Sequence, residues 1–167
     1  AHVPDVANPL VPGTETLSVR GAGSHVDGSA GFSNWGTSGN TATITFSDQA
    51  TGTFGGINLA SSATMGTVGN FSVRNDGSGG AVVNTGSISI AAISSGTQGT
   101  LTIDGAGSTL MQSAAAILEV GSIAATGSAT VNVQNGGTLN AGSGLTQVNN
   151  TGTINVNAGT LNSTGNL

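Results

Sequence analysis

The chain has very few charged residues, and it lacks cysteine, lysine and tyrosine altogether. Two arginines and seven acidic residues give its 167 residues a formal net charge of −5. Nucleic acids and anionic membrane surfaces bind proteins through clustered basic residues, so we expect neither as a partner. No apolar run reaches the length of a membrane-spanning helix, and we expect no membrane insertion. The lack of cysteine excludes disulfide bonds and leaves the compartment open.

Proline is also scarce, and its distribution divides the chain. Pro4, Pro9 and Pro12 are the three prolines of the sequence, and none occurs from Gly13 to Leu167. Proline has no N–H group, which a central β-strand must donate to its neighbour. We therefore predict an extended N-terminal arm or cap over residues 1–13. Residues 14–167 are predicted to form a domain of fully paired strands.

What the sequence does contain is a repeat of short apolar pairs, each following threonine or asparagine. The six pairs are Leu17/Val19, Ile44/Phe46, Phe71/Val73, Leu101/Ile103, Val131/Val133 and Ile154/Val156. Successive pairs start 27, 27, 30, 30 and 23 residues apart. Two copies match closely, as TLSVRGAGS from Thr16 and TLTIDGAGS from Thr100. Repeats of this length indicate a solenoid, in which each coil packs only on its neighbours.

Each repeat continues with more apolar residues after a glycine-containing corner. The second apolar positions are Val26, Phe54, Val82, Leu110, Leu139 and Leu161. The third positions are Ile57/Leu59, Ile88/Ile90, Leu118/Val120 and Leu145/Val148. Alternation with a period of two indicates strands rather than helices, and an antiparallel sandwich gives no reason for a repeat near 27 residues. The pattern predicts an all-β fold, a single-stranded right-handed parallel β-helix of about six coils with 23 to 30 residues each.

The repeat register also predicts which side chains face outward from the first strand of each coil. The two outward columns are Thr16, Thr43, Asn70, Thr100, Thr130, Thr153 and Ser18, Thr45, Ser72, Thr102, Asn132, Asn155. We interpret this neutral face as a solvated strand surface, since threonine favours strands. A face that organises water in ice binding and a glycan-binding face are the alternatives. A further column places Arg74 beside Asp104, which predicts a surface ion pair.

The acidic residues offer little for catalysis, because they are spread over different coils. They are Asp5, Glu15, Asp27, Asp48, Asp76, Asp104 and Glu119. The β-helix enzymes that cleave polysaccharides need clustered carboxylates, so we predict a protein that is not an enzyme, without catalytic residues or a cofactor. His2 and His25 lack the spacing of a metal site, and we expect none.

Two short motifs have both a structural and a functional interpretation. The Asp-Gly pairs at Asp27 and Asp76 and the Asp-Gly-Ala-Gly segment at Asp104 are typical of tight corners, and they lack the spacing of known calcium loops. Trp35 follows Phe32-Ser-Asn, and we interpret it as a buried corner aromatic. A sugar-stacking platform is the alternative for Trp35.

Three units carry a resemblance to a known group of proteins: TLTIDGAGSTL from Thr100 to Leu110, LEVGS from Leu118 to Ser122, and ATVNVQNGGTL from Ala129 to Leu139. They resemble the β-solenoid repeats of bacterial autotransporter passengers and of PEP-CTERM-associated surface proteins, in which these units recur in this order. The resemblance implies an extracellular or cell-surface location and a role in display, adhesion or matrix building. It implies no shared catalytic residues.

The last repeat bears on assembly. Ile154 to Leu161 is as regular as the other coils and carries neither a charged nor a proline-rich cap. An uncapped solenoid end exposes strand edges, which template further pairing. We therefore expect a secreted, non-catalytic structural solenoid whose copies join head to tail into filaments. The alternatives are an adhesin that binds glycans or other cell-surface components through the threonine and asparagine face or through Gly31 to Gly39, and an ice-binding solenoid.

Overall fold

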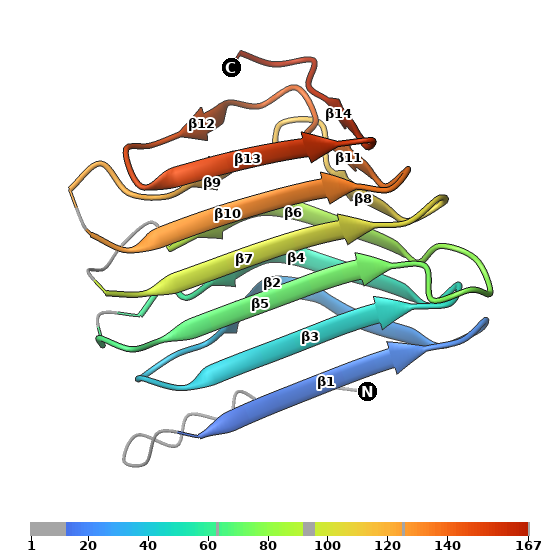
Figure 1. The fold of residues 1–167 in the computed structure, drawn as a ribbon, viewed down its shortest axis with the longest axis horizontal. Coiled ribbons are helices and arrows are strands. Elements are labelled where there is room, and N and C mark those ends of the chain that lie inside the picture. The colour runs from blue at the N-terminus through green and yellow to red at the C-terminus, as the bar shows by residue number, and fades with distance from the viewer. Residues whose placement is uncertain (1–12, 63, 92–95, 125, 167) are drawn as a thin grey trace.

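The computed structural model describes residues 13–62, 64–91, 96–124 and 126–166, and it confirms the all-β parallel solenoid. The chain winds as a right-handed coil from β1 at one end to β13 and β14 at the other (Figure 1). The strands are β1 (Thr14–Arg20), β2 (His25–Trp35), β3 (Thr41–Ser47), β4 (Thr51–Leu59), β5 (Val68–Arg74), β6 (Val82–Ile90), β7 (Gln98–Asp104), β8 (Thr109–Gln112), β9 (Leu118–Val120), β10 (Ser128–Gln134), β11 (Thr138–Asn140), β12 (Thr146–Val148), β13 (Gly152–Asn157) and β14 (Thr160–Asn162).

One sheet, called sheet A here, takes one strand from each coil. Its order is β1-β3-β5-β7-β10-β13, and every pairing in it is parallel. The predicted inward ladder is confirmed, because the register stacks Leu17, Ile44, Phe71, Leu101, Val131 and Ile154 in one column. The four central members are buried, whereas Leu17 and Ile154 at the two ends are half-buried. Each central side chain thus gains about 1.5–3 kcal/mol from burial between its neighbours.

The opposite side of the coil, called sheet B here, differs from the prediction of three short strands per repeat. In the first three coils, one long strand (β2, β4 or β6) takes the place of the second and third short strands. β6 then pairs with both β8 and β9, and the following coils keep two separate strands on this side. The three-strand description is therefore correct for two coils, β7-β8-β9 and β10-β11-β12, whereas the last described coil has the two strands β13 and β14.

Three apolar positions predicted for the strands of sheet B differ from the structure. Two predictions are wrong by one residue, and in the third case the predicted residue lies two positions from the column. Val83, not Val82, is buried and stacks between Gly52 and Leu110. Leu145 is exposed, and the neighbouring Thr146 stacks on Leu118 instead. Phe54 is buried as expected, but Gly52 occupies its place in the column. The cause is the corner length, which varies between coils and shifts the alternation of the strand that follows.

The two closely matching sequence units form the same corner. Gly21 and Gly23 have φ angles of 91° and 82°, and Gly105 and Gly107 have φ angles of 87° and 83°. A residue with a Cβ is strained in this region, which explains the glycine at both positions. The backbone N–H of Ser24 donates to the carbonyl of Gly21 at 3.1 Å, and Ser108 donates to Gly105 at the same distance. The repeated sequence GAGS therefore encodes one turn used twice.

Candidate functional site

The two predicted outward columns of sheet A are polar and uncharged, as expected. The pairing register places the two threonine-, serine- and asparagine-rich columns side by side over all six strands. Some of these side chains form hydrogen bonds with the next residue in their column. Thr45 Oγ1 lies 3.4 Å from Ser72 Oγ, and Asn155 Nδ2 donates to Asn132 Oδ1 at 3.0 Å. These bonds link neighbouring coils and leave a surface of hydroxyls and amides without a formal charge.

The predicted ion pair between Arg74 and Asp104 is wrong, although the two residues are register partners on β5 and β7. Arg74 Nε lies 3.0 Å from Asp76 Oδ1, on the turn that follows its own strand. Asp104 Oδ1 instead accepts a hydrogen bond from Asn135 Nδ2 at 2.7 Å. The turn residue is the closer partner, because the corner after β5 folds Asp76 back toward the guanidinium.

A second ion pair joins Arg20 to Asp48 at the neighbouring corner. Arg20 Nε lies 2.6 Å from Asp48 Oδ2, and the side chain of Asp48 is only 5% exposed. Asp48 Oδ1 also accepts the backbone N–H groups of Asp76 and Ser78, at 3.2 and 3.4 Å. Asp48 thus binds a corner of its own coil to a corner of the next coil.

The remaining described carboxylates are held by local polar groups. Glu15 accepts from Asn40 Nδ2 at 3.2 Å, and Glu119 accepts from Asn149 Nδ2 at 3.3 Å. Asp27 accepts hydrogen bonds from the hydroxyl and the backbone N–H of Ser29, which hold the pKa of the Asp27 carboxyl below its ordinary value. In the described residues no group of three or more His, Asp or Glu side chains converges as metal ligands would. Asp5 and His2 lie outside the described residues.

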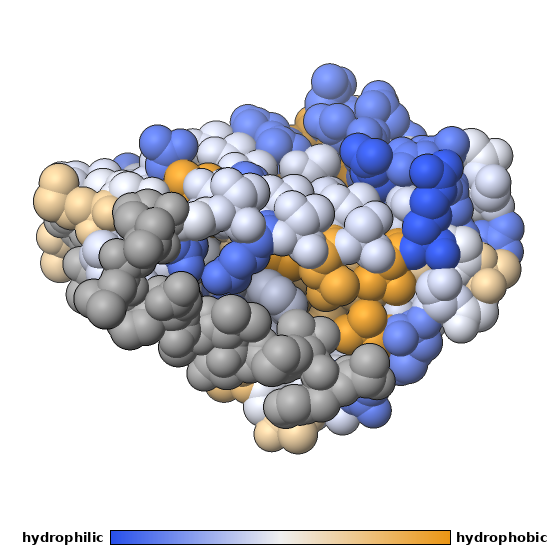
Figure 2. Space-filling model, turned by 90° about the horizontal axis from the view of Figure 1, so that it is seen from below, coloured by the Kyte–Doolittle hydropathy of each residue, from blue (hydrophilic) through white to orange (hydrophobic). Residues whose placement is uncertain are grey.

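A hollow of about 430 Å³ lies at the N-terminal end of the solenoid and is lined mainly by residues of β1, β2, β3 and β4. Its walls are mostly apolar and come from Leu17, Val26, Ile44 and Phe54. Figure 2, which looks at this end, shows apolar side chains at the surface between polar ones. Glu15 adds a carboxylate at an inward position that alanine or glycine takes in the later coils. Leu17 and Trp35 of the first coil are half-buried at this end, whereas Val19 and Val26 are only 8% exposed.

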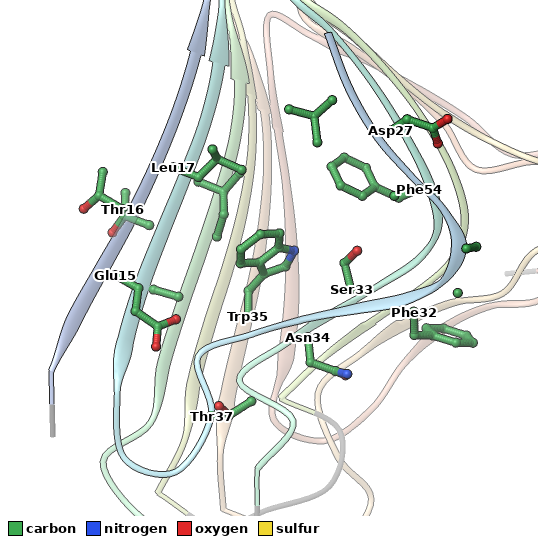
Figure 3. A pocket seen from close by; sticks show the side chains of 17 residues that line it. Glu15, Thr16, Leu17, Asp27, Phe32, Ser33, Asn34, Trp35, Thr37 and Phe54 are labelled. Atoms are coloured by element: carbon green, nitrogen blue, oxygen red, sulfur yellow. The ribbon is translucent and has the colours of Figure 1, made fainter. Parts of the chain in front are cut away.

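Two aromatic residues of β2 lie on opposite sides of this strand (Figure 3). Trp35 points into the hollow, is half-buried, and has an indole N–H without a partner among the described residues. Phe32 points outward and is 57% exposed. The expected buried corner aromatic is therefore only half-buried, and the exposed aromatic of this stretch is Phe32. Phe32 and Trp35 are three residues apart, and neighbouring residues of a strand face opposite sides. An odd separation in the sequence therefore predicts that the two aromatic side chains lie on opposite sides of β2.

The far end of the described chain presents a similar apolar surface. Val156 on β13 is half exposed, whereas its register partner Val133 on β10 is buried. Ile154 and Leu161 are half-buried and pack against the core from this side. Val156, Ile154 and Leu161 of the last coil, and Leu17 of the first, are thus more exposed than the residues at the same positions in the central coils.

Comparisons with protein-family models, with curated proteins and with solved structures find no match for this chain. In the part of the chain that the structure describes, no helix is long and apolar enough to span a lipid bilayer.

Proposed function

We propose that this chain is a non-catalytic structural β-solenoid of a cell surface or extracellular matrix, and that its copies join head to tail into filaments. The observation that carries the proposal is the match between the two edge strands of sheet A. β1 and β13 have the same alternation, and within the described residues no strand pairs with the outer edge of either one. A parallel strand edge of this kind is a template for another strand.

The register inside the molecule defines how a second copy would continue sheet A. If β1 of the next copy follows β13 as β13 follows β10, Ile154 lies against Leu17 and Val156 lies against Val19. Gly152 then lies against Glu15 at the position that alanine or glycine takes in the other coils. The apolar ladder would run through the joint at the usual strand spacing of about 4.8 Å.

Sheet B continues across the same joint. Leu161 shares its column with Val26, so it would cover the hollow of the next copy. Asn162 shares its column with Asp27, and an amide facing a carboxylate repeats the bond from Asn135 to Asp104 between adjacent coils. The joint uses two different surfaces, so it does not close on itself and copies add without limit.

The composition and the repeat pattern support the location. The chain is acidic, lysine-free and rich in glycine, and its corners resemble those of bacterial surface solenoids. The uncharged polar columns on the outside of sheet A would keep the side of a filament hydrated along its whole length. The geometry favours neither ice binding nor catalysis over this structural role.

Electron microscopy and sedimentation velocity of the purified 167-residue chain test the assembly. We expect rods that lengthen with protein concentration, built from units of about 29 Å for six stacked strands. Short rods of one length at the highest concentration would overturn the filament. Immunolabelling of intact source cells tests the location separately, and label found only after the cells are opened would contradict it.

A further inference from the structure

The outer face of sheet B carries a groove that the filament does not use. It measures about 310 Å³ and lies against β2, β4, β6 and the segment before β9. Its lining combines three apolar residues, Phe32, Ile88 and Ile117, with four polar ones, Asn58, Ser87, Ser89 and Glu119. The groove runs along the side of the coils, so every copy in a filament would still expose it.

Phe32 is held in place by a glycine beneath it. Phe32 is the register partner of Gly56 on β4, and a Cβ on Gly56 would overlap the Phe32 ring. The ring therefore lies directly on the glycine backbone, an arrangement that protects a glycine inside a strand. The side chain is nevertheless 57% exposed, so part of the ring faces the groove. An exposed aromatic that is fixed in this way loses little conformational entropy when a ligand packs on it.

Polar groups line the groove beside the ring, one from each coil. Asn34, Asn58, Ser89 and Glu119 follow one another in a single outward column. Asn58 Nδ2 donates to Asn34 Oδ1 at 2.8 Å, which leaves the carbonyl oxygen of Asn58 open to a ligand. Glu119 accepts only long bonds, from Ser89 Oγ at 3.5 Å and from Asn149 Nδ2 at 3.3 Å. A carboxylate has room for further donors, and hydroxyl groups bind it strongly.

We propose that this groove binds a neutral saccharide. A sugar ring has an apolar C–H face that fits the exposed ring of Phe32, and it has hydroxyl groups at its edge for Asn58, Ser89 and Glu119. Glu119 in the groove and the net charge of −5 disfavour an acidic sugar or a phosphate. The apolar surface is confined to Phe32, Ile117 and the edge of Ile88, too little for the apolar core of a stable protein interface. This proposal does not depend on end-to-end assembly.

NMR titration of the full chain with neutral tetrasaccharides, at protein concentrations below those at which rods form, tests the proposal. The probes are cellotetraose, maltotetraose and chitotetraose at millimolar concentrations, with tetragalacturonate as the acidic comparison. We expect at least one neutral probe to shift the backbone amides of Gly56, Ser87 and Ser89, and tetragalacturonate to bind more weakly.

Three variants separate stacking from packing. Phe32→Leu keeps an apolar side chain over Gly56 but removes the ring face, and we expect the affinity to fall about tenfold. Glu119→Gln is expected to weaken neutral binding and to reduce the discrimination against tetragalacturonate. Met65→Ala removes an exposed apolar side chain outside the groove and should leave the affinity unchanged. Equal binding by Phe32→Leu and the unmodified chain, shifts confined to other residues, or no shift with any neutral probe would overturn the proposal.

Discussion

Val133 and Val156 occupy the same inward position on neighbouring strands of sheet A, but only Val156 is exposed to solvent. This difference marks the surface that a second copy would cover. Val156→Asp would place an unpaired carboxylate in that joint, where burial of a charge is costly. We expect the variant to fold and to remain a single short rod in sedimentation velocity at concentrations where the unmodified chain forms filaments.

The matched control for this prediction is Ile123→Asp. Ile123 is also an exposed apolar residue, but it lies in the segment between β9 and β10 rather than on the end surface. The control should assemble like the unmodified chain. Filaments of normal length from Val156→Asp would show that β13 is not part of the joint.

Asp48 is expected to contribute more to stability than its ion-pair partner Arg20. Arg20 is 66% exposed, so Arg20→Ala should cost only about 0–1 kcal/mol in the free energy of unfolding. Asp48→Ala also leaves the backbone N–H groups of Asp76 and Ser78 without their acceptor, and we expect a loss of about 1–3 kcal/mol. Urea denaturation measures both losses.

Asp48→Asn separates the charge from the hydrogen bonds. Asn keeps a side-chain oxygen for the two N–H groups, and it tolerates the φ angle of 55° at this position better than alanine does. We expect a loss close to that of Arg20→Ala. If Asp48→Asn is as damaging as Asp48→Ala, the ion pair rather than the backbone bonds holds the corner.

Phe71 joins the aromatic cluster of the core to the centre of sheet A. Its ring lies 5.7 Å from Phe46 and 6.0 Å from Phe54, measured between centroids, and its side chain is buried. Phe71→Ala should cost about 3–5 kcal/mol, because the neighbouring coils cannot close the cavity. Thr102→Ala, on the outward face of the next strand, is the control and should change the thermal midpoint little. A small loss for Phe71→Ala would mean that the coils are stabilised nearly independently.

The columns of sheet A could be predicted from the sequence because a strand alternates with a period of two and each coil begins with the same short motif. Thr16, Thr43 and Thr100 therefore mark the register without any knowledge of the corners. The strands after the corners were harder to place. One residue more or less in a turn moves the inward-facing residues of the following strand to its outer side, and the outward-facing residues to its inner side. For this reason Val83, and not Val82, is buried.

Contacts that depend on how a turn folds back could not be predicted from the register. Arg74 and Asp104 share a column, yet Arg74 binds Asp76, because only the corner conformation brings Asp76 near the guanidinium. The positions of the aromatic residues in β2 could be predicted only in part. The stretch from Gly31 to Gly39 is one alternative for glycan binding by an adhesin, but the inner or outer position of Phe32 and Trp35 depends on the irregular pairing of β2 between Gly28 and Phe32.

Asp27 gives a prediction about pH, because Ser29 supplies the two largest causes of its lowered pKa. The hydroxyl of Ser29 is the largest cause of the lowered pKa of Asp27, and the backbone N–H of Ser29 adds to it. A carboxyl whose pKa is lower in the folded chain stabilises the fold when it is ionised, and this contribution is lost as the pH falls through the folded pKa.

Ser29→Ala should therefore raise the pKa of Asp27 toward its ordinary value, while Ser29→Thr should keep it low. Carbon-13 NMR titration of the Asp27 carboxyl measures its pKa in both variants. The stability difference between Ser29→Ala and Ser29→Thr should accordingly shrink at the acid end of the titration, and an unchanged pKa in Ser29→Ala would show that the backbone bond alone holds the carboxylate.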